Sequence, residues 1–195
     1  NPQIVIDIGE NRKGMKEELD SLQNQIGIPI VHIEYSLDKC DEVFNMLGKI
    51  FNEKNNAEIL SKYCRNTYDE IVNKMNYLDK KNAIYVLGQD GKNVLAEKSY
   101  AAEALNLFIN NVAKIDNPSI KGSGDEIDLE QIIKWNPDYI FFENGSIYNS
   151  VKGNGLWNEI NAIKNNNFYE VPNLPYNLLG SPLAIQQFLG MKWAC

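Results

Sequence analysis

Two stretches of this chain enter an apolar run through the same dipeptide. Asn1-Pro2 precedes the apolar run 4–6 after one polar residue, and Asn136-Pro137 precedes the run 139–142 in the same way. Proline pushes the residue before it out of the α-helical region, so each pair ends any helix and begins extended chain. A short run of β-branched and aromatic residues bounded in this way is typical of a buried strand.

The likeness continues, because each predicted strand is followed by a polar loop, an amphipathic segment and a second strand. In the first unit these are loop 9–13, the segment with Met15, Leu19, Leu22 and Ile26, and strand 28–33. In the second they are loop 143–146, the helical segment with Leu156, Trp157, Ile160 and Ile163, and strand 167–172. Two such units predict two α/β lobes with a cleft between the carboxyl ends of their strands. The open alternative is that Asn-Pro is a common strand-entry pair and the repetition is chance.

Between these units, strands and helices are predicted to alternate, which favours a parallel-rich sheet. The expected segments are a helix carrying Val43, Phe44, Leu47 and Ile50, strand 83–87, a turn at 88–91 with extended chain 93–96, helix 100–108, strand 111–113, and a helix from Asp125 to Trp135. Acids in the first turn of the last helix suit the helix dipole.

A long amphipathic pattern runs from about Glu53 to Leu78. Its apolar positions recur at helical spacing and are Ala57, Leu60, Cys64, Tyr68, Ile71, Val72 and Met75. A helix of this length spans roughly 35–40 Å, which is more than one small lobe needs. We therefore expect a connector that packs on both halves of the chain, with a plain surface helix as the alternative.

Charge and cysteine usage exclude some partners and ligands. The 195 residues carry a formal net charge of −7 without an offsetting basic stripe, so nucleic acid is not expected as a partner. The three cysteines, Cys40, Cys64 and Cys195, form no CxxC pair, so zinc is not indicated and we expect them to be thiols.

No catalytic constellation is found in the sequence. The sole histidine, His32, lies within predicted strand 28–33, and a lone strand histidine is more often a packed or surface residue than a catalyst. There is no P-loop, GxGxxG or HExxH motif. We expect no enzymatic activity, no cofactor and no metal site.

Several segments, taken in order, resemble one known family. In the C-terminal half they are 111–113, the acid-led helix ending in Trp135-Asn136-Pro137, and 157–165 leading into 168–172. In the N-terminal half they are 1–6, 27–31, 47–50, 57–60 and Tyr63. Their order and spacing resemble the substrate-binding proteins of ABC importers for iron chelates, haem and cobalamin. Segments 175–182 and 189–193 resemble a subgroup for iron or other metal chelates.

The resemblance implies an α/β fold of two Rossmann-like lobes with parallel-rich sheets, joined by one long helix. The expected parts are a partial N-terminal lobe over 1–51, the inter-lobe helix over 52–81 and the C-terminal lobe over 82–195. The N-terminal lobe is expected to be incomplete, because family members usually begin before the first strand seen here. The protein is expected outside the cytoplasm, periplasmic or lipid-anchored to the outer face of the cell membrane, with the anchor outside this chain.

The resemblance also implies a function in iron transport, as the subunit that captures a metal chelate (a siderophore, haem or a corrinoid) and docks on an ABC permease. Glu103 and Glu143 are the docking candidates, because surface glutamates usually meet permease arginines in this family. The alternatives are an enzyme on a similar two-lobe scaffold, such as a metal chelatase or a nucleotide-sugar transferase, and a small interaction domain.

Ligand contacts are expected in the loops at strand carboxyl ends, which border the cleft of an open α/β sheet. The candidates are Asn11, Arg12, Tyr35, Ser99, Tyr100, Asn144, Tyr176 and Asn177. Tyrosine and asparagine can hydrogen-bond to or stack on a chelate, and Arg12 can pair with an anionic one. Asn144 and Tyr176 are expected on one cleft wall, because parallel strands place their carboxyl ends on one edge.

The first 51 residues contain only two predicted strands, and two strands make a marginal sheet. They would pair with upstream strands, lean on the long helix, or pair with another copy of the chain along the open edge. We expect the full-length protein to be a monomer. This chain by itself is expected to self-associate and to bind ligand weakly, because one wall of its cleft is incomplete.

Overall fold

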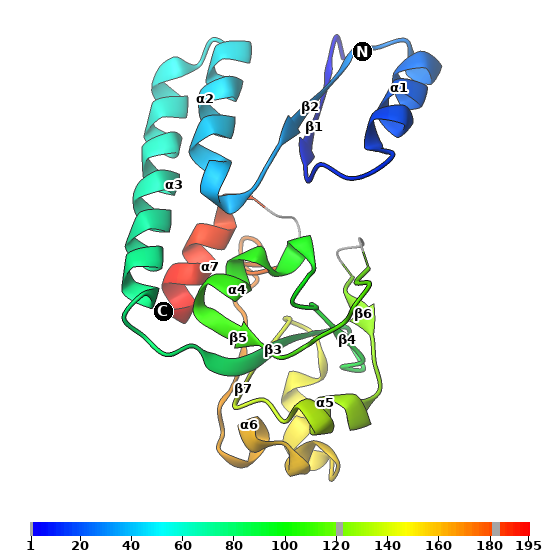
Figure 1. Cartoon of the computed structure of the whole chain (residues 1–195), viewed down its shortest axis with the longest axis vertical. Coiled ribbons are helices and arrows are strands. Elements are labelled where there is room, and N and C mark those ends of the chain that lie inside the picture. Colours follow the sequence, from blue (N-terminus) through cyan, green and yellow to red (C-terminus); the bar gives the residue numbers. More distant parts are fainter. Residues whose placement is uncertain (1, 120–122, 181–183) are drawn as a thin grey trace. The chain divides into compact units, whose positions relative to one another are not determined.

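The computed structural model describes residues 2–119, 123–180 and 184–195 (Figure 1). Asn1, from the first Asn-Pro pair, and the end of segment 175–182 lie outside the described residues. The chain divides into two units, Asn1–Tyr68 and Asp69–Cys195. The boundary falls inside helix α3, which runs unbroken over Lys54–Met75 as the long amphipathic pattern predicts.

Unit 1 contains the first predicted β-loop-α-β motif. Its elements are β1 (Val5–Gly9), α1 (Met15–Ile26), β2 (Ile30–Glu34), η1 (Leu37–Lys39), α2 (Cys40–Ile50) and the first part of α3. Strands β1 and β2 pair in parallel, from Val5 opposite Ile30 to Gly9 opposite Glu34. Gly27 ends α1 in the left-handed conformation (φ 67°), and its N–H bonds to the Gln23 carbonyl.

Helices α2 and α3 run side by side in unit 1 (Figure 1). The Asn45 side chain donates to Ser61 Oγ at 3.0 Å, and the Arg65 guanidinium pairs with the Asp41 carboxylate at 2.7 Å. At Gly48 the helices approach so closely that an added Cβ would lie 2.3 Å from the Ala57 Cβ. Polar contacts and close backbone approach therefore hold α2 against α3 at defined positions along both helices.

Unit 2 is built on a six-stranded sheet of order β6-β4-β3-β7-β8, with β5 also paired to β3. Its strands are β3 (Lys81–Leu87), β4 (Asn93–Val94), β5 (Ile109–Asn111), β6 (Asp125–Glu126), β7 (Tyr139–Phe142) and β8 (Phe168–Glu170). Its helices are η2 (Tyr100–Ala102), α4 (Glu103–Phe108), α5 (Leu129–Trp135), η3 (Ile147–Gly153), η4 (Trp157–Glu159), α6 (Asn161–Lys164) and α7 (Gln186–Ala194). Strands β5, β3, β7 and β8 are mutually parallel, which confirms the predicted parallel-rich sheet.

Helical segments cover both faces of this sheet. On one face, Ile84, Ile140 and Phe142 form a buried cluster with side chains of α5, η3, η4 and α6. On the other face, Phe141 packs edge-on against Phe108 of α4 and Trp193 of α7. A central strand buried on both faces needs a nearly continuous apolar run, which explains the sequence of β3 and β7.

Three predicted elements in unit 2 differ from the structure. Asp125 does not start a helix: it pairs in β6 with Val94 of β4, its carboxylate accepts the Ser119 N–H at 2.6 Å, and α5 begins only at Leu129. The strand predicted at 111–113 is β5, two residues earlier. The helix predicted through Leu156 and Ile163 is broken at Ile160, whose backbone is extended between η4 and α6.

Candidate functional site

Three strands of unit 2 end at a common edge. Val86 of β3 lies opposite Phe142 of β7, which lies opposite Glu170 of β8. The loops that follow these strands therefore emerge together, at the carboxyl ends where open α/β sheets bind ligands. We call this the carboxyl edge of unit 2.

A hydrogen-bond network centred on Asn177 ties these loops together. The Asn177 amide nitrogen lies 3.1 Å from the Tyr85 hydroxyl and 3.4 Å from Glu143 Oε1, and the amide oxygen accepts the Gly180 N–H at 2.8 Å. The other carboxylate oxygen of Glu143 accepts the Gly88 N–H at 3.4 Å. The network thus joins β3 and the segments after β3, β7 and β8.

Tyr85 is the buried member of this network. Its side chain is fully buried, and burial raises the pKa of its hydroxyl well above the ordinary value of 10.0, because the phenolate would be poorly solvated. The bond to Asn177 opposes this rise, and the charge of Glu143 adds to it. The phenol is therefore neutral at physiological pH and positions Asn177 by hydrogen bonding.

A second set of contacts lies at the same edge. The Asn173 amide donates to Asn144 Oδ1 at 2.9 Å, and the Gly145 N–H donates to Glu170 Oε1 at 3.3 Å. Tyr176, in the same loop as Asn173, is 60% exposed. The loops that carry Asn144 and Tyr176 therefore lie at one edge of the sheet, with polar and aromatic groups open to solvent.

The other predicted residues on unit 2 have different surroundings. Ser99 is buried, and its Oγ caps η2 by accepting the Ala101 N–H at 3.3 Å. Tyr100 opens η2, and Glu103 is half-buried at the start of α4. The other docking candidate, Glu143, belongs to the hydrogen-bond network centred on Asn177.

Unit 1 brings its predicted residues to the carboxyl edge of its own small sheet. The Tyr35 N–H donates to the Gly9 carbonyl at 2.9 Å, so the loops after β1 and β2 meet. Asn11 and Arg12 are exposed, and Arg12 pairs with Glu18, whose hydrogen bond raises the pKa of the guanidinium. Tyr35 itself is only 6% exposed.

His32 has a structural partner in unit 1. Its Nδ1 lies 2.7 Å from Asp7 Oδ2 on the neighbouring strand. It also borders a small hollow of about 220 Å³ with Glu34 and Lys39, which form an ion pair at 3.1 Å. Within residues 2–119, 123–180 and 184–195, no group of three or more His, Cys, Asp or Glu side chains could hold a metal ion.

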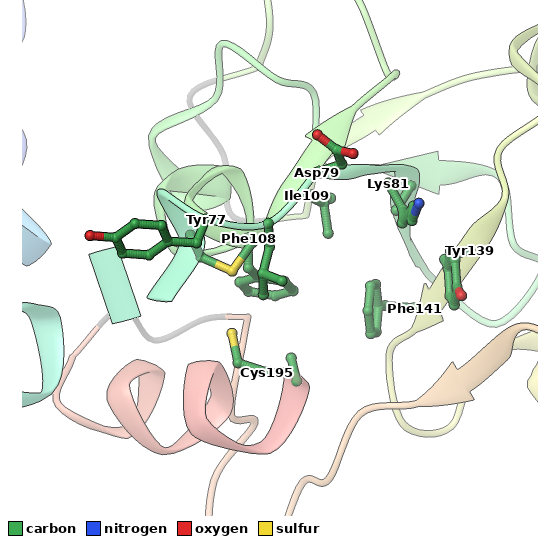
Figure 2. Close-up of a pocket in the computed structure, with 12 residues that line it drawn as sticks. Tyr77, Asp79, Lys81, Phe108, Ile109, Tyr139, Phe141 and Cys195 are labelled. Carbon is green, nitrogen blue, oxygen red and sulfur yellow. The ribbon is translucent and has the colours of Figure 1, made fainter. Parts of the chain in front are cut away.

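A cavity of unit 2, larger than the hollow beside His32, is lined by residues at the amino ends of the parallel strands and by aromatic rings (Figure 2). It has a volume of about 510 Å³, and Lys81, Ile109 and Tyr139, the first residues of β3, β5 and β7, line it. The rings of Phe108 and Phe141 form an apolar wall. The cavity borders the amino ends of the parallel strands, whereas open α/β sheets bind ligands at the carboxyl ends. It is therefore not the expected ligand site.

The sequence of the chain matches one protein family over most of its length. The periplasmic binding protein family matches residues 2–174. The chain belongs to this family. Its relatives are solute-binding components of ABC transporters rather than enzymes. No helix in the described part of the chain is both long and apolar enough to cross a membrane.

Similar proteins share this fold over almost the whole chain. The high-affinity heme uptake system protein IsdE of Staphylococcus aureus (strain MRSA252) is 24% identical over 176 residues, covering 84% of this chain and 59% of the relative. An ABC transporter solute binding protein from Sulfurospirillum deleyianum has a TM-score of 0.90 and 25% identity, covering 99% of this chain and 60% of that one. The periplasmic vitamin B12 binding protein BtuF of Vibrio cholerae has a TM-score of 0.76 and 17% identity, covering 100% of this chain and 72% of that one. The chain thus spans about three fifths of the length of the first two.

Sequence reasoning missed Tyr85, Asn173 and Glu170 at the carboxyl edge. Asn173 directly follows predicted strand 167–172, so its place in the loop after the strand was the available signal, whereas Glu170 lies within that predicted strand. Tyr85 is the one residue with a hydroxyl in the run 83–87, where it resembles any core aromatic until the fold brings Asn177 to it.

Proposed function

We propose that this chain is part of the substrate-binding component of an ABC importer and that it captures a metal chelate: a siderophore, haem or a corrinoid. The observation that carries the proposal is the solvent-exposed polar edge formed by Asn144, Asn173 and Tyr176 at the carboxyl ends of β7 and β8. A relative named for haem uptake and a neighbour named for vitamin B12 binding support this class of ligand. In this proposal α3 links a lobe that ends near residue 51 to one that begins near residue 82.

The charges at the carboxyl edge favour a neutral or cationic chelate. Glu143 and Glu170 both accept backbone N–H groups there, and amides and a phenol supply the other polar groups. Arg12 belongs to unit 1 and is paired with Glu18, and the other arginine of the chain, Arg65, is paired with Asp41. An anionic ligand would face two carboxylates, whereas amide or hydroxamate groups would find hydrogen-bond partners.

Thermal unfolding with added chelates tests the proposal. The probes are a cationic ferric hydroxamate, neutral cyanocobalamin and anionic haemin, because a ligand that binds the folded state raises Tm. We expect the first two classes to raise Tm more than haemin. A larger shift with haemin would overturn the charge argument but keep the chelate proposal, and no shift with any probe, for this chain and for a longer one extended upstream, would overturn both.

Substitutions localise the binding. Asn144→Ala and Tyr176→Ala remove exposed groups of the carboxyl edge, so we expect each to weaken chelate binding about tenfold, as the loss of one good hydrogen bond or stacking contact would. Asn158→Ala, at an exposed position of η4 in the same unit, is the matched control and is expected to leave affinity unchanged. Unchanged chelate affinity in both Asn144→Ala and Tyr176→Ala would show that the ligand does not bind at the carboxyl edge.

We further propose that the protein partner is an ABC permease and that the protein acts outside the cytoplasm, either in the periplasm or lipid-anchored to the outer face of the cell membrane. Glu103 and Glu143 remain the docking candidates. Glu143 belongs to the hydrogen-bond network of the carboxyl edge, where its substitution would also disturb the proposed ligand contacts, so the docking test uses Glu103→Gln. We expect this variant to lower uptake by the reconstituted importer without changing chelate affinity, and equal uptake would contradict a docking role.

A further inference from the structure

Two of the three cysteines face each other in the interior of unit 1. Cys40 is the first residue of α2 and Cys64 lies in α3, and their Sγ atoms are 3.1 Å apart. Each residue is only 1% exposed. A disulfide has an S–S bond of about 2.05 Å, so bonding requires an approach of only about 1 Å.

The surrounding contacts fix this juxtaposition. One residue further along each helix, Asp41 and Arg65 form an ion pair at 2.7 Å, and Asn45 bonds to Ser61 one turn away. At the other end of the helix pair, Gly48 lies against Ala57. Polar contacts and close packing thus set the register of α2 against α3 independently of the cysteines.

We propose that Cys40 and Cys64 are a disulfide site that staples the start of α2 to α3. The proposed location of the protein outside the cytoplasm would provide an oxidising compartment, but formation of the bond from these two residues does not depend on that location. The staple links residues that are 24 positions apart, and closing such a loop restricts the unfolded chain.

The oxidant is a disulfide of the thiol–disulfide exchange class. The thiolate of one cysteine attacks that disulfide and releases one thiol, and the second cysteine then attacks the mixed disulfide and releases the other thiol. Two protein thiols lose two protons and two electrons, and the oxidant gains them as two thiols. Each cysteine is only 1% exposed in the folded state, so the oxidant reaches the thiols before α2 and α3 close on each other. In the folded state the hydrogen bond to Cys40 and burial also raise the pKa of the Cys64 thiol.

Oxidative refolding of the purified chain tests the proposal without any ligand, so its failure is distinct from failure of the binding proposal. The reduced, unfolded chain is refolded with oxidised and reduced glutathione, quenched with acid, alkylated under denaturing conditions and mapped by mass spectrometry. We expect a linked Cys40–Cys64 peptide and a single alkylated cysteine, Cys195. The oxidised chain should have a Tm about 10 °C above that of the reduced chain.

Two variants separate the staple from other thiol chemistry. Cys195→Ser should retain both the link and the Tm difference, because Cys195 is exposed and belongs to the other unit. Cys40→Ala should lose the link, and its Tm should be the same in oxidising and in reducing buffer. Three alkylated cysteines after oxidative refolding, or a link that includes Cys195, would overturn the proposal.

Discussion

Asn177 illustrates what a single residue does at the carboxyl edge of unit 2. A buried hydroxyl such as that of Tyr85 needs a hydrogen-bond partner, and the partner comes from 92 positions later in the chain. The position of Asn177 after a strand was predictable from predicted strand 167–172, which precedes it. Its inward role was not, because local sequence does not record which buried group a loop residue will meet.

Asn177→Ala should destabilise unit 2 by about 1–3 kcal/mol, the usual effect of leaving buried hydrogen-bonding groups unpaired. The substitution removes the partner of the Tyr85 hydroxyl and of the Gly180 N–H. Urea unfolding measures the loss. Asn158→Ala, which removes one weak hydrogen bond at an exposed position of η4, should leave the unfolding free energy within about 0.5 kcal/mol of that of the unsubstituted chain. Equal stability of both variants would contradict the network.

Tyr85 also predicts a pH dependence in the alkaline range. Its pKa is raised in the folded state, so above pH 10.0 an unfolded chain loses a proton that the folded chain retains, and stability falls as pH rises. The slope contributed by this residue is at most about 1.4 kcal/mol per pH unit. The unfolding free energy, measured on both sides of pH 10, should fall less steeply with pH in Tyr85→Phe than in the unsubstituted chain. Tyr77→Phe, at a ring that is 88% exposed, should keep the original slope.

Among the elements, those with a complete local pattern were predicted and those that depend on distant partners were not. The apolar periodicity of α3 and the Asn-Pro entry to β7 are encoded locally, and both form as expected. Asp125 has helix-start chemistry, yet β4 recruits its backbone into the sheet. Ile160 has helical spacing with Trp157 and Ile163, yet all three are buried in one cluster with the helix broken between them. Tertiary contacts overrode local propensity at both sites.

The contact between α2 and α3 gives a prediction for a pair of elements. Gly48→Ala should destabilise unit 1 by about 1–3 kcal/mol, because its Cβ would overlap that of Ala57, and this exceeds the gain of roughly 1 kcal/mol in helix propensity. Chemical unfolding of the variant measures the effect. Gly153→Ala, where no atom lies within 4 Å of the added Cβ, should not destabilise the chain. The double variant Gly48→Ala/Ala57→Gly should recover most of the loss, and failure to recover would mean that the overlap is not its cause.

At the scale of the whole molecule, the two units differ in how well their apolar side chains are buried. Unit 2 has a sheet covered on both faces, whereas the only strands described in unit 1 are β1 and β2, and α1 has no buried residue. Ile4, Ile8, Leu22 and Ile26 of unit 1 are between 38% and 44% exposed. A parallel pair of short strands leaves hydrogen-bonding groups unpaired along both outer edges, which is a template for further strands.

We therefore predict that this chain self-associates through the sheet of unit 1 in a concentration-dependent manner, which sedimentation velocity over a wide range of concentrations would measure. Ile8→Lys should reduce the association, because a lysine beside an open strand edge opposes pairing with another copy. Ile59→Lys is the control, since Ile59 is 67% exposed on α3 and lies outside the sheet. A chain that stays monomeric at every concentration would show that β1 and β2 need no further strand. Loss of association in Ile59→Lys alone would place the contact on α3 instead, so the two variants together decide which surface of unit 1 a second copy uses.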